Sequence, residues 1–202
     1  MRESSGHDRR HGAKQPKIFS HERAAVLDDD ERESWFARDD VVRLIDAGRG
    51  ATIVDFGTGT GRYAIALAQQ RPDVRVLAYD VQPEMLAIVR ARIAELHLMN
   101  LTACSRLDDE IADIVLAANV LHEIGDVEIV ALAKATKRDG AALVVDWEAA
   151  IERPTGPPAD HVHTVAEARE RLLRNGFTSV EPILAPQFPY HYVLRARRAE
   201  GT

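Results

Sequence analysis

Short, mostly apolar runs alternate along this chain with longer amphipathic stretches. An apolar run bounded by turn residues predicts a buried strand, whereas apolar positions three and four apart predict a helix. On this basis we expect seven strands, at residues 51–56, 74–79, 101–104, 112–118, 141–147, 177–184 and 190–197.

The helical patterns fall between these strands. Pro83 suits the first turn of a helix, Asp126 is a candidate N-cap, and Thr164 with Glu167 forms a capping box. Strands that alternate with helices imply an α/β fold with a mainly parallel sheet covered on both faces. The short connection between the last two strands indicates a C-terminal antiparallel hairpin. The expected helices are 39–47, 61–70, 83–98, 126–137 and 165–175.

The composition is that of a globular protein. The chain has 202 residues, 46% of them hydrophobic and 29% charged, which is enough for one domain with a full core. The net charge of −6 argues against nucleic acid as a partner. The single cysteine, Cys104, excludes an internal disulfide and a cysteine-based zinc site. His161 and His163 alone are a weak metal signal, so we expect no metal.

The N-terminal region differs from the rest. Residues 1–17 are polar and lack the apolar segment of a secretory signal, so we expect a disordered tail. Residues 18–202 would then form one domain, with residues 18–40 as a helical lid that brings Trp35 and Phe36 over the site. No apolar stretch reaches the roughly 20 residues of a membrane span, and we expect a cytoplasmic protein.

The candidate chemistry begins where the first strand ends. The strand carries Asp55 and breaks into Gly57, Gly59 and Gly61 before a helical pattern starts. A strand, glycine turn and helix bring backbone N–H groups close to a nucleotide-like ligand. The dinucleotide fingerprint, however, is Gly-x-Gly-x-x-Gly, and this spacing is Gly-x-Gly-x-Gly. Asp80, about 20 positions on, does fit the acidic position of that fingerprint.

Asp55 separates two kinds of ligand. A carboxylate beside a pyrophosphate would be repulsive, whereas a carboxylate beside a cationic amino-acid group would be favourable. The loop therefore favours a cationic nucleoside over a dinucleotide.

Several segments resemble class I S-adenosylmethionine-dependent methyltransferases, in the order that this family shows. The run Asp55-Phe-Gly-Thr-Gly-Thr-Gly61 resembles the first motif, and Asp80 ends the second strand as the family's acidic residue does. Residues 19–36 are similar to the lead-in of ubiquinone and menaquinone methyltransferases. The resemblance covers residues 18–198, and its other segments are 113–122, 137–147 and 156–177.

This resemblance implies a Rossmann-like fold with S-adenosylmethionine as the cofactor. In the family's pattern Asp80 holds the ribose hydroxyls, Val81 packs on the adenine, and Asn119 lies in the cofactor pocket. The segment 104–110 is compressed relative to the family, and we transfer no adenine contact to it. The expected cofactor-binding residues are Asp55, Gly57, Thr58, Gly59, Gly61, Asp80, Val81 and Asn119.

The expected activity is in-line transfer of a methyl group to a small-molecule acceptor. His122 follows the fourth strand, where the family's loop faces the transferred methyl group, and imidazole can act as a general base near neutral pH. An arsenite acceptor would need several cysteines, and the Asn-Pro-Pro-Tyr motif of many amino-group methylating enzymes on nucleic acids is missing. Two alternatives remain, a Rossmann-type NAD(P)-dependent oxidoreductase and a catalytically inactive S-adenosylmethionine-binding protein. The acceptor and the oligomeric state stay open.

Overall fold

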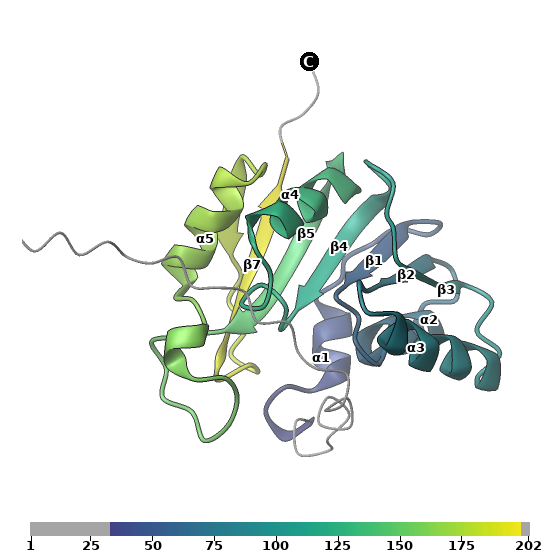
Figure 1. Ribbon diagram of the computed structural model, residues 1–202, viewed down its shortest axis with the longest axis horizontal. Helices are drawn as coiled ribbons and strands as arrows, with labels where there is room; N and C mark the ends of the chain where they lie inside the picture. The colour runs from purple at the N-terminus through teal and green to yellow at the C-terminus, as the bar shows by residue number, and fades with distance from the viewer. Residues whose placement is uncertain (1–32, 199–202) are drawn as a thin grey trace, which may run out of the picture.

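The computed structural model describes residues 33–198. Its seven strands form one sheet in the order β3-β2-β1-β4-β5-β7-β6 (Figure 1). The strands are β1 (Thr52–Phe56), β2 (Arg75–Tyr79), β3 (Leu101–Cys104), β4 (Ala112–Ala118), β5 (Thr136–Trp147), β6 (Ser179–Pro182) and β7 (His191–Arg197).

Neighbouring strands from β3 to β5 are parallel, and β7 is antiparallel to both β5 and β6. This arrangement confirms the predicted α/β fold, the mainly parallel seven-stranded sheet and the C-terminal antiparallel pair. The order of the strands in the sheet changes direction at the parallel pair β1 and β4: β2 and β3 follow β1 on one side, and β5 follows β4 on the other. In open α/β sheets ligands bind at such a switch point, beyond the carboxyl ends of the strands.

Helices cover both faces of the sheet (Figure 1). Strand residues alternate between two apolar clusters, because successive side chains point to opposite faces. Ile53 packs in the cluster of α1 and α2, whereas Val54 packs in the cluster of α4 and α5. The helices are α1 (Arg38–Arg43), α2 (Arg62–Gln70), α3 (Pro83–Glu95), α4 (Asp126–Ala135) and α5 (Val165–Arg174), with a 3₁₀ turn at Ala159–His161.

Three local predictions were wrong. The first helix, expected over residues 39–47, ends at Arg43. Residues 136–140 continue directly from α4 as the first part of β5, where we expected helix and turn. Gly140 permits this because a Cβ there would lie 2.7 Å from the carbonyl oxygen of Asp113. The N-cap of α4 is Gly125 and not Asp126, and the Glu128 carboxylate accepts the Gly125 N–H at 3.0 Å. The capping box at Thr164 is present as predicted.

The predicted tail at residues 1–17 and most of the predicted lid lie outside the described residues. The described part of the lid, residues 33–40, packs against the domain, and Phe36 is completely buried. Within residues 33–198 there is no helix long and apolar enough to cross a membrane.

Candidate active site

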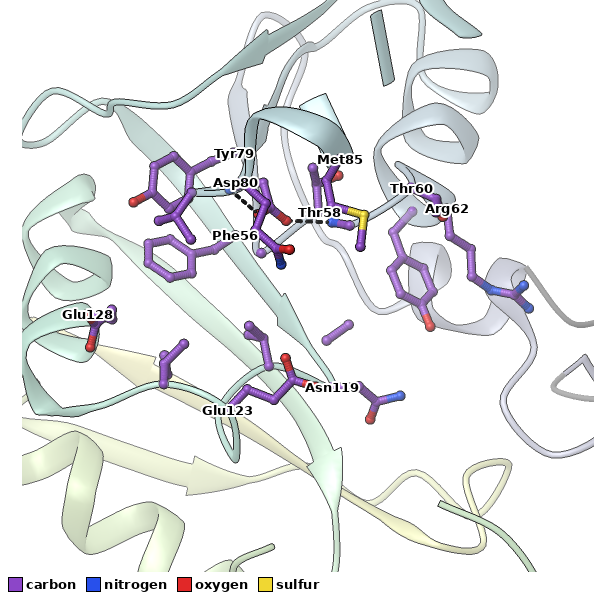
Figure 2. A pocket seen from close by; sticks show the side chains of 18 of the residues that line it. Phe56, Thr58, Thr60, Arg62, Tyr79, Asp80, Met85, Asn119, Glu123 and Glu128 are labelled. Carbon is purple, nitrogen blue, oxygen red and sulfur yellow. Dashed lines mark hydrogen bonds between the residues drawn. The ribbon is translucent and has the colours of Figure 1, made fainter. Parts of the chain in front are cut away.

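A pocket lies at the switch point, beyond the carboxyl ends of β1, β2 and β4 (Figure 2). Three segments build most of its wall: the glycine loop (residues 57–61), the end of β2 and the β4 loop (residues 119–125). The lining residues are Phe56, Gly57, Thr58, Gly59, Thr60, Arg62, Tyr63, Tyr79, Asp80, Val81, Gln82, Met85, Ala118, Asn119, Val120, Glu123, Ile124, Gly125 and Glu128.

The glycine loop needs glycine for two reasons. Gly57, Gly59 and Gly61 have φ angles of 72°, 53° and 87°, a region that other residues seldom adopt. In addition, a Cβ on Gly57 would lie 2.5 Å from a methyl carbon of Val120. Close packing of the glycine loop on the β4 loop therefore sets the shape of the pocket.

The backbone amides of the glycine loop are already used within the protein. The N–H groups of Gly57 and Thr58 both donate to the carbonyl of Tyr79 at 2.9 Å. Gly59 donates its N–H to Asp80 Oδ2 at 2.9 Å, and Gly61 donates to the carbonyl of Thr58 at 2.9 Å. A phosphate-binding loop instead directs its N–H groups at the ligand. These four amides do not form a pyrophosphate cradle in this structure.

Asp55 lies beneath the loop and is 1% exposed. One of its oxygens accepts the Thr58 hydroxyl at 2.7 Å and the Ala64 N–H at 3.1 Å. Burial raises the pKa of Asp55 to about 6, the two hydrogen bonds oppose this, and the nearby Asp80 adds to it. Asp55 thus ties the loop to the first turn of α2, and it is not among the lining residues.

Asp80 does line the pocket. Its Oδ2 accepts the Gly59 N–H, and its Oδ1 accepts the Gln82 N–H at 2.9 Å. Each carboxylate oxygen can accept a further hydrogen bond, so the fixed carboxylate can still receive two donors from a ligand. Val81 is next to it, also lines the pocket and is 54% exposed.

Asn119 lies across the pocket from Asp80 (Figure 2). Its backbone has a φ of 56°, and its N–H donates to the Val145 carbonyl at 2.8 Å. Both side-chain amide atoms are buried and have no hydrogen-bond partner within the described part of the chain. A buried amide left without partners costs free energy.

His122 lies behind the pocket wall, with its side chain 8% exposed. Its Nδ1 is 2.7 Å from Asp146 Oδ1, and its backbone N–H donates to Asp146 Oδ2 at 3.1 Å. Its Nε2 is 3.6 Å from Glu123 Oε1, and Glu123 does line the pocket. Burial alone would lower the pKa of His122, but the charges and hydrogen bond of Asp146 and the charge of Glu123 raise it. Asp146 is completely buried, and despite that burial the contacts with His122 hold its pKa below the usual range.

The β4 loop is held from α5 by one side chain. Arg171 donates to the carbonyls of Leu121 at 3.1 Å and Ile124 at 2.9 Å. Its guanidinium also contacts His163 Nε2 at 2.7 Å. These contacts fix the segment that carries Asn119 and Glu123, so the pocket wall is preformed.

An aromatic cluster joins the described part of the lid to the end of β5. The Trp35 ring lies 5.2 Å from the Trp147 ring and stacks on His191, with ring centroids 5.9 Å apart. Phe36 stacks on the same His191 at 4.1 Å. On the pocket side, Glu33 pairs with Arg62 at 2.6 Å, so this segment also reaches the pocket wall.

The structure brings six of the nine predicted site residues together on the pocket wall. These are Gly57, Thr58, Gly59, Asp80, Val81 and Asn119. Asp55, Gly61 and His122 are adjacent to the wall but not part of it. The wall residues that sequence reasoning missed include Arg62, Tyr79, Met85, Glu123 and Glu128.

Some of these residues left a signal in the sequence. Tyr79 ends a predicted strand, and Glu123 directly follows His122 in the β4 loop, so both could have been placed at the carboxyl edge of the sheet. Glu128 left no such signal, because only the packing of α4 brings it to the pocket. Residues 104–110 are not among the lining residues.

Comparisons with known proteins identify relatives of the domain and of the fold. Residues 53–140 match the family model of the methyltransferase domain. Release factor glutamine methyltransferase from Bacteroides thetaiotaomicron is 32% identical over 126 residues, which are 61% of this chain and 44% of that protein. The chain thus spans less than half the length of this curated relative.

Solved structures show the same fold. An S-adenosylmethionine-dependent methyltransferase from Aquifex aeolicus superposes with a TM-score of 0.79 at 25% identity, over 89% of this chain and 98% of that one. SpnF, described as a cyclase, superposes with a TM-score of 0.67 at 20% identity, over 86% of this chain and 85% of that one. Residues 53–140 therefore match a methyltransferase domain, and the described part of the chain has the fold of an S-adenosylmethionine-dependent methyltransferase.

Proposed function

We propose that this protein transfers the methyl group of S-adenosylmethionine to a small-molecule acceptor. The observation that carries the proposal is the pocket at the switch point. Asp80 lines this pocket beside the glycine loop, and the backbone amides of that loop are already hydrogen-bonded within the protein. Such a loop offers close approach of the backbone and a carboxylate, and it lacks the free amides of a pyrophosphate site.

The charge of the pocket wall fits this cofactor. Three carboxylates line it, those of Asp80, Glu123 and Glu128. The guanidinium on the wall, that of Arg62, is already paired with Glu33 at 2.6 Å. S-adenosylmethionine supplies an electrophilic methyl group on a cationic sulfonium, and an acidic wall favours a cation over a pyrophosphate.

The roles proposed for individual residues follow from their positions. Asp80 accepts the ribose hydroxyls, and the exposed Val81 packs on the adenine. The unpartnered amide of Asn119 binds a polar group of the ligand or acceptor. Asp55 and Gly61 act indirectly, by holding the glycine loop and the start of α2 in shape. His122 is the acid–base residue next to the pocket.

A protein glutamine side chain is a second candidate acceptor. The similarity to release factor glutamine methyltransferases favours it. The small-molecule acceptor is supported by the N-terminal segment, because Glu33 and Trp35 attach that segment to the pocket wall and to the end of β5. In this proposal residues 33–40 form the described part of a lid over a small acceptor.

Calorimetry with S-adenosylmethionine and S-adenosylhomocysteine tests the cofactor assignment. We expect micromolar binding by the wild type and at least about tenfold weaker binding by Asp80→Ala, because charge-assisted hydrogen bonds are lost. The exposed Asp109→Ala is the matched control and should bind as the wild type does. No binding by the wild type at high micromolar ligand overturns the proposal, and equal binding by Asp80→Ala overturns the ribose assignment. Fluorescence titration with NADH tests the oxidoreductase alternative.

A second experiment separates the two acceptors. Radiolabelled S-adenosylmethionine is offered with a panel of phenols and small carboxylates, and separately with glutamine-containing release factor peptides. Label in the small molecules supports the proposal, and label in the peptides alone replaces it with protein methylation. Tight cofactor binding with no label in either arm favours the alternative of a binding protein without methyl transfer activity.

A further inference from the structure

Three side chains form a continuous row from the interior of the sheet to the pocket wall. Asp146 is completely buried on β5, and its Oδ1 lies 2.7 Å from His122 Nδ1. On the other side of the ring, His122 Nε2 lies 3.6 Å from Glu123 Oε1. Glu123 faces the pocket beside Asn119 (Figure 2). This carboxylate–imidazole–carboxylate row, Asp146–His122–Glu123, is called the relay below.

Asp146 determines which nitrogen of His122 carries the proton. Besides the imidazole, the Asp146 carboxylate accepts the backbone N–H of Trp147 at 2.7 Å and that of His122 at 3.1 Å. A carboxylate only accepts hydrogen bonds, so the neutral ring donates from Nδ1 to Asp146. Nε2 is then left as the basic nitrogen, and it faces Glu123.

The charges around His122 allow it to keep an added proton. Asp146 on β5 and Glu123 on the same loop both favour the imidazolium, whereas Arg153 in the loop after β5 opposes it. Burial also opposes the charged ring, but the two carboxylates outweigh both effects and raise the pKa of His122. When Nε2 gains a proton, the resulting imidazolium ring lies between two negatively charged carboxylates, which stabilise its positive charge.

Methylation of an acceptor atom that carries hydrogen releases one proton. The bond from that atom to the methyl carbon forms, the carbon–sulfur bond breaks with its electron pair left on sulfur, and the hydrogen leaves the acceptor atom as a proton. His122 is 8% exposed and is not part of the pocket wall, whereas Glu123 is. The group that meets the acceptor proton first is thus a carboxylate.

We propose that Glu123 accepts the proton of the acceptor atom and that His122, oriented by Asp146, stores it. This inference rests on the proposed methyl transfer and narrows its substrate class to acceptors with an exchangeable O–H or N–H on the methylated atom. Glu123 is the catalytic residue in this scheme, and Asp146 is a positioning residue. A sulfide or a tertiary amine acceptor would have no proton to give and would not use the relay.

The relay is tested without knowledge of the acceptor. The ¹⁵N shifts of the His122 imidazole report both its titration and its tautomer, and they are recorded between about pH 5 and 10 for the wild type and three variants. We expect the Nδ1–H tautomer in the neutral wild type. Glu123→Gln should lower the midpoint of the His122 titration by about one pH unit, and Asp146→Asn should lower it further. The exposed Asp109→Asn, in the segment between β3 and β4, is the control and should leave the midpoint unchanged.

Two results overturn the relay: an Nε2–H tautomer in the wild type, or a His122 midpoint that Glu123→Gln leaves unmoved. If Asp146→Asn does not fold, Glu123→Gln still tests the relay. The Glu123 side chain is 20% exposed, so its replacement by Gln should disturb folding less than the replacement of the completely buried Asp146. Calorimetry with S-adenosylmethionine on the same samples is independent. If the wild type does not bind S-adenosylmethionine, the proposed function is refuted. If it binds but the His122 midpoint does not respond to Glu123→Gln, the relay alone is refuted.

Once the radiolabelling experiment has identified a methyl acceptor, the methyl transfer rate of the variants can be measured. Glu123→Gln should then reduce kcat about 100-fold with an unchanged affinity for S-adenosylmethionine, because general base catalysis is lost. An unchanged kcat would overturn the role of Glu123.

Discussion

Two buried carboxylates of the same sheet behave in opposite ways. Asp55 is on β1 and 1% exposed, and Asp146 is on β5 and completely buried. Asp55 shares a face with Ile53 and contacts the first turn of α2, whereas Asp146 shares the opposite face with Val144. The pKa of Asp55 is raised to about 6, while the pKa of Asp146 is held below its ordinary value.

The partners explain the difference. Burial disfavours the charged form of both carboxylates. Asp55 receives hydrogen bonds from a hydroxyl and an amide, which are neutral, and these only reduce the effect of burial. Asp146 has the imidazole of His122 at 2.7 Å, and a partner that can carry positive charge reverses the effect. The comparison indicates that the β1 carboxylate fixes a loop through neutral hydrogen-bond donors, whereas the β5 carboxylate stays charged beside an imidazole.

Removal of the Asp146 carboxylate should have the largest effect on stability. Asp146→Ala leaves the His122 ring and two backbone N–H groups, those of His122 and Trp147, buried without their acceptor. We expect the free energy of unfolding at pH 7 to fall by about 3–5 kcal/mol, measured by chemical denaturation. Arg138→Ala removes an exposed ion pair with Glu110 and is the control, with no measurable change expected. A similarly small change in Asp146→Ala would contradict the role assigned to this carboxylate.

The pH dependence of stability should separate Asp55 from Asp146. The folded-state pKa of Asp55, about 6, is above its ordinary 3.8, so its contribution to stability decreases as the pH rises from about 4 to 6. The wild type should therefore lose about 2 kcal/mol relative to Asp55→Asn between pH 4 and pH 7. The stability contribution of Asp146 depends on pH in the opposite direction, because it is lost as the pH falls through the lowered pKa of this carboxyl.

Thermal and chemical unfolding of the wild type and Asp55→Asn at several pH values measures this difference. A difference that stays constant from pH 4 to pH 7 would show that the pKa of Asp55 is not raised.

The smallest effect is expected from the neutral partner of Asp55. Thr58→Val removes the hydroxyl that donates to Asp55 at 2.7 Å while keeping the size of the side chain. We expect the free energy of unfolding to fall by about 1 kcal/mol, and the carboxyl ¹³C titration of Asp55 to move further above pH 6. Thr102→Val, an exposed strand position, is the matched control. A fall as large as that of Asp146→Ala would remove the distinction between neutral and charged partners.

Much of the fold could be predicted from the sequence because it depends on local patterns. Apolar runs located the seven strands, with β3 and β4 at their predicted bounds and the other strands mostly within a few residues. The exception is β5, which begins five residues early. Its first part is polar, and its strand geometry depends on the close approach of Gly140 to β4. A contact of this kind between distant segments leaves no periodicity in the sequence.

The candidate site could be predicted in part for the same reason. Glycines with positive φ and a carboxylate at a strand end are local features, so Gly57, Gly59 and Asp80 were found. The sequence does not reveal which carboxylates face the pocket, because that depends on contacts between distant segments. Asp55 points beneath the loop toward α2, and Glu128 reaches the pocket from α4.

The sequence by itself determined the α/β fold, the glycine loop and the place of Asp80 at the end of a strand, because strand, turn and helix patterns are properties of short segments. Only the tertiary structure decided that the loop amides are already used and that Asp55 and Asp146 face opposite layers. It also decided that His122 lies between Asp146 and Glu123. The physical reason is that hydrogen bonding and burial depend on which segments the sheet brings into contact, and the charge state of a buried group follows from those contacts.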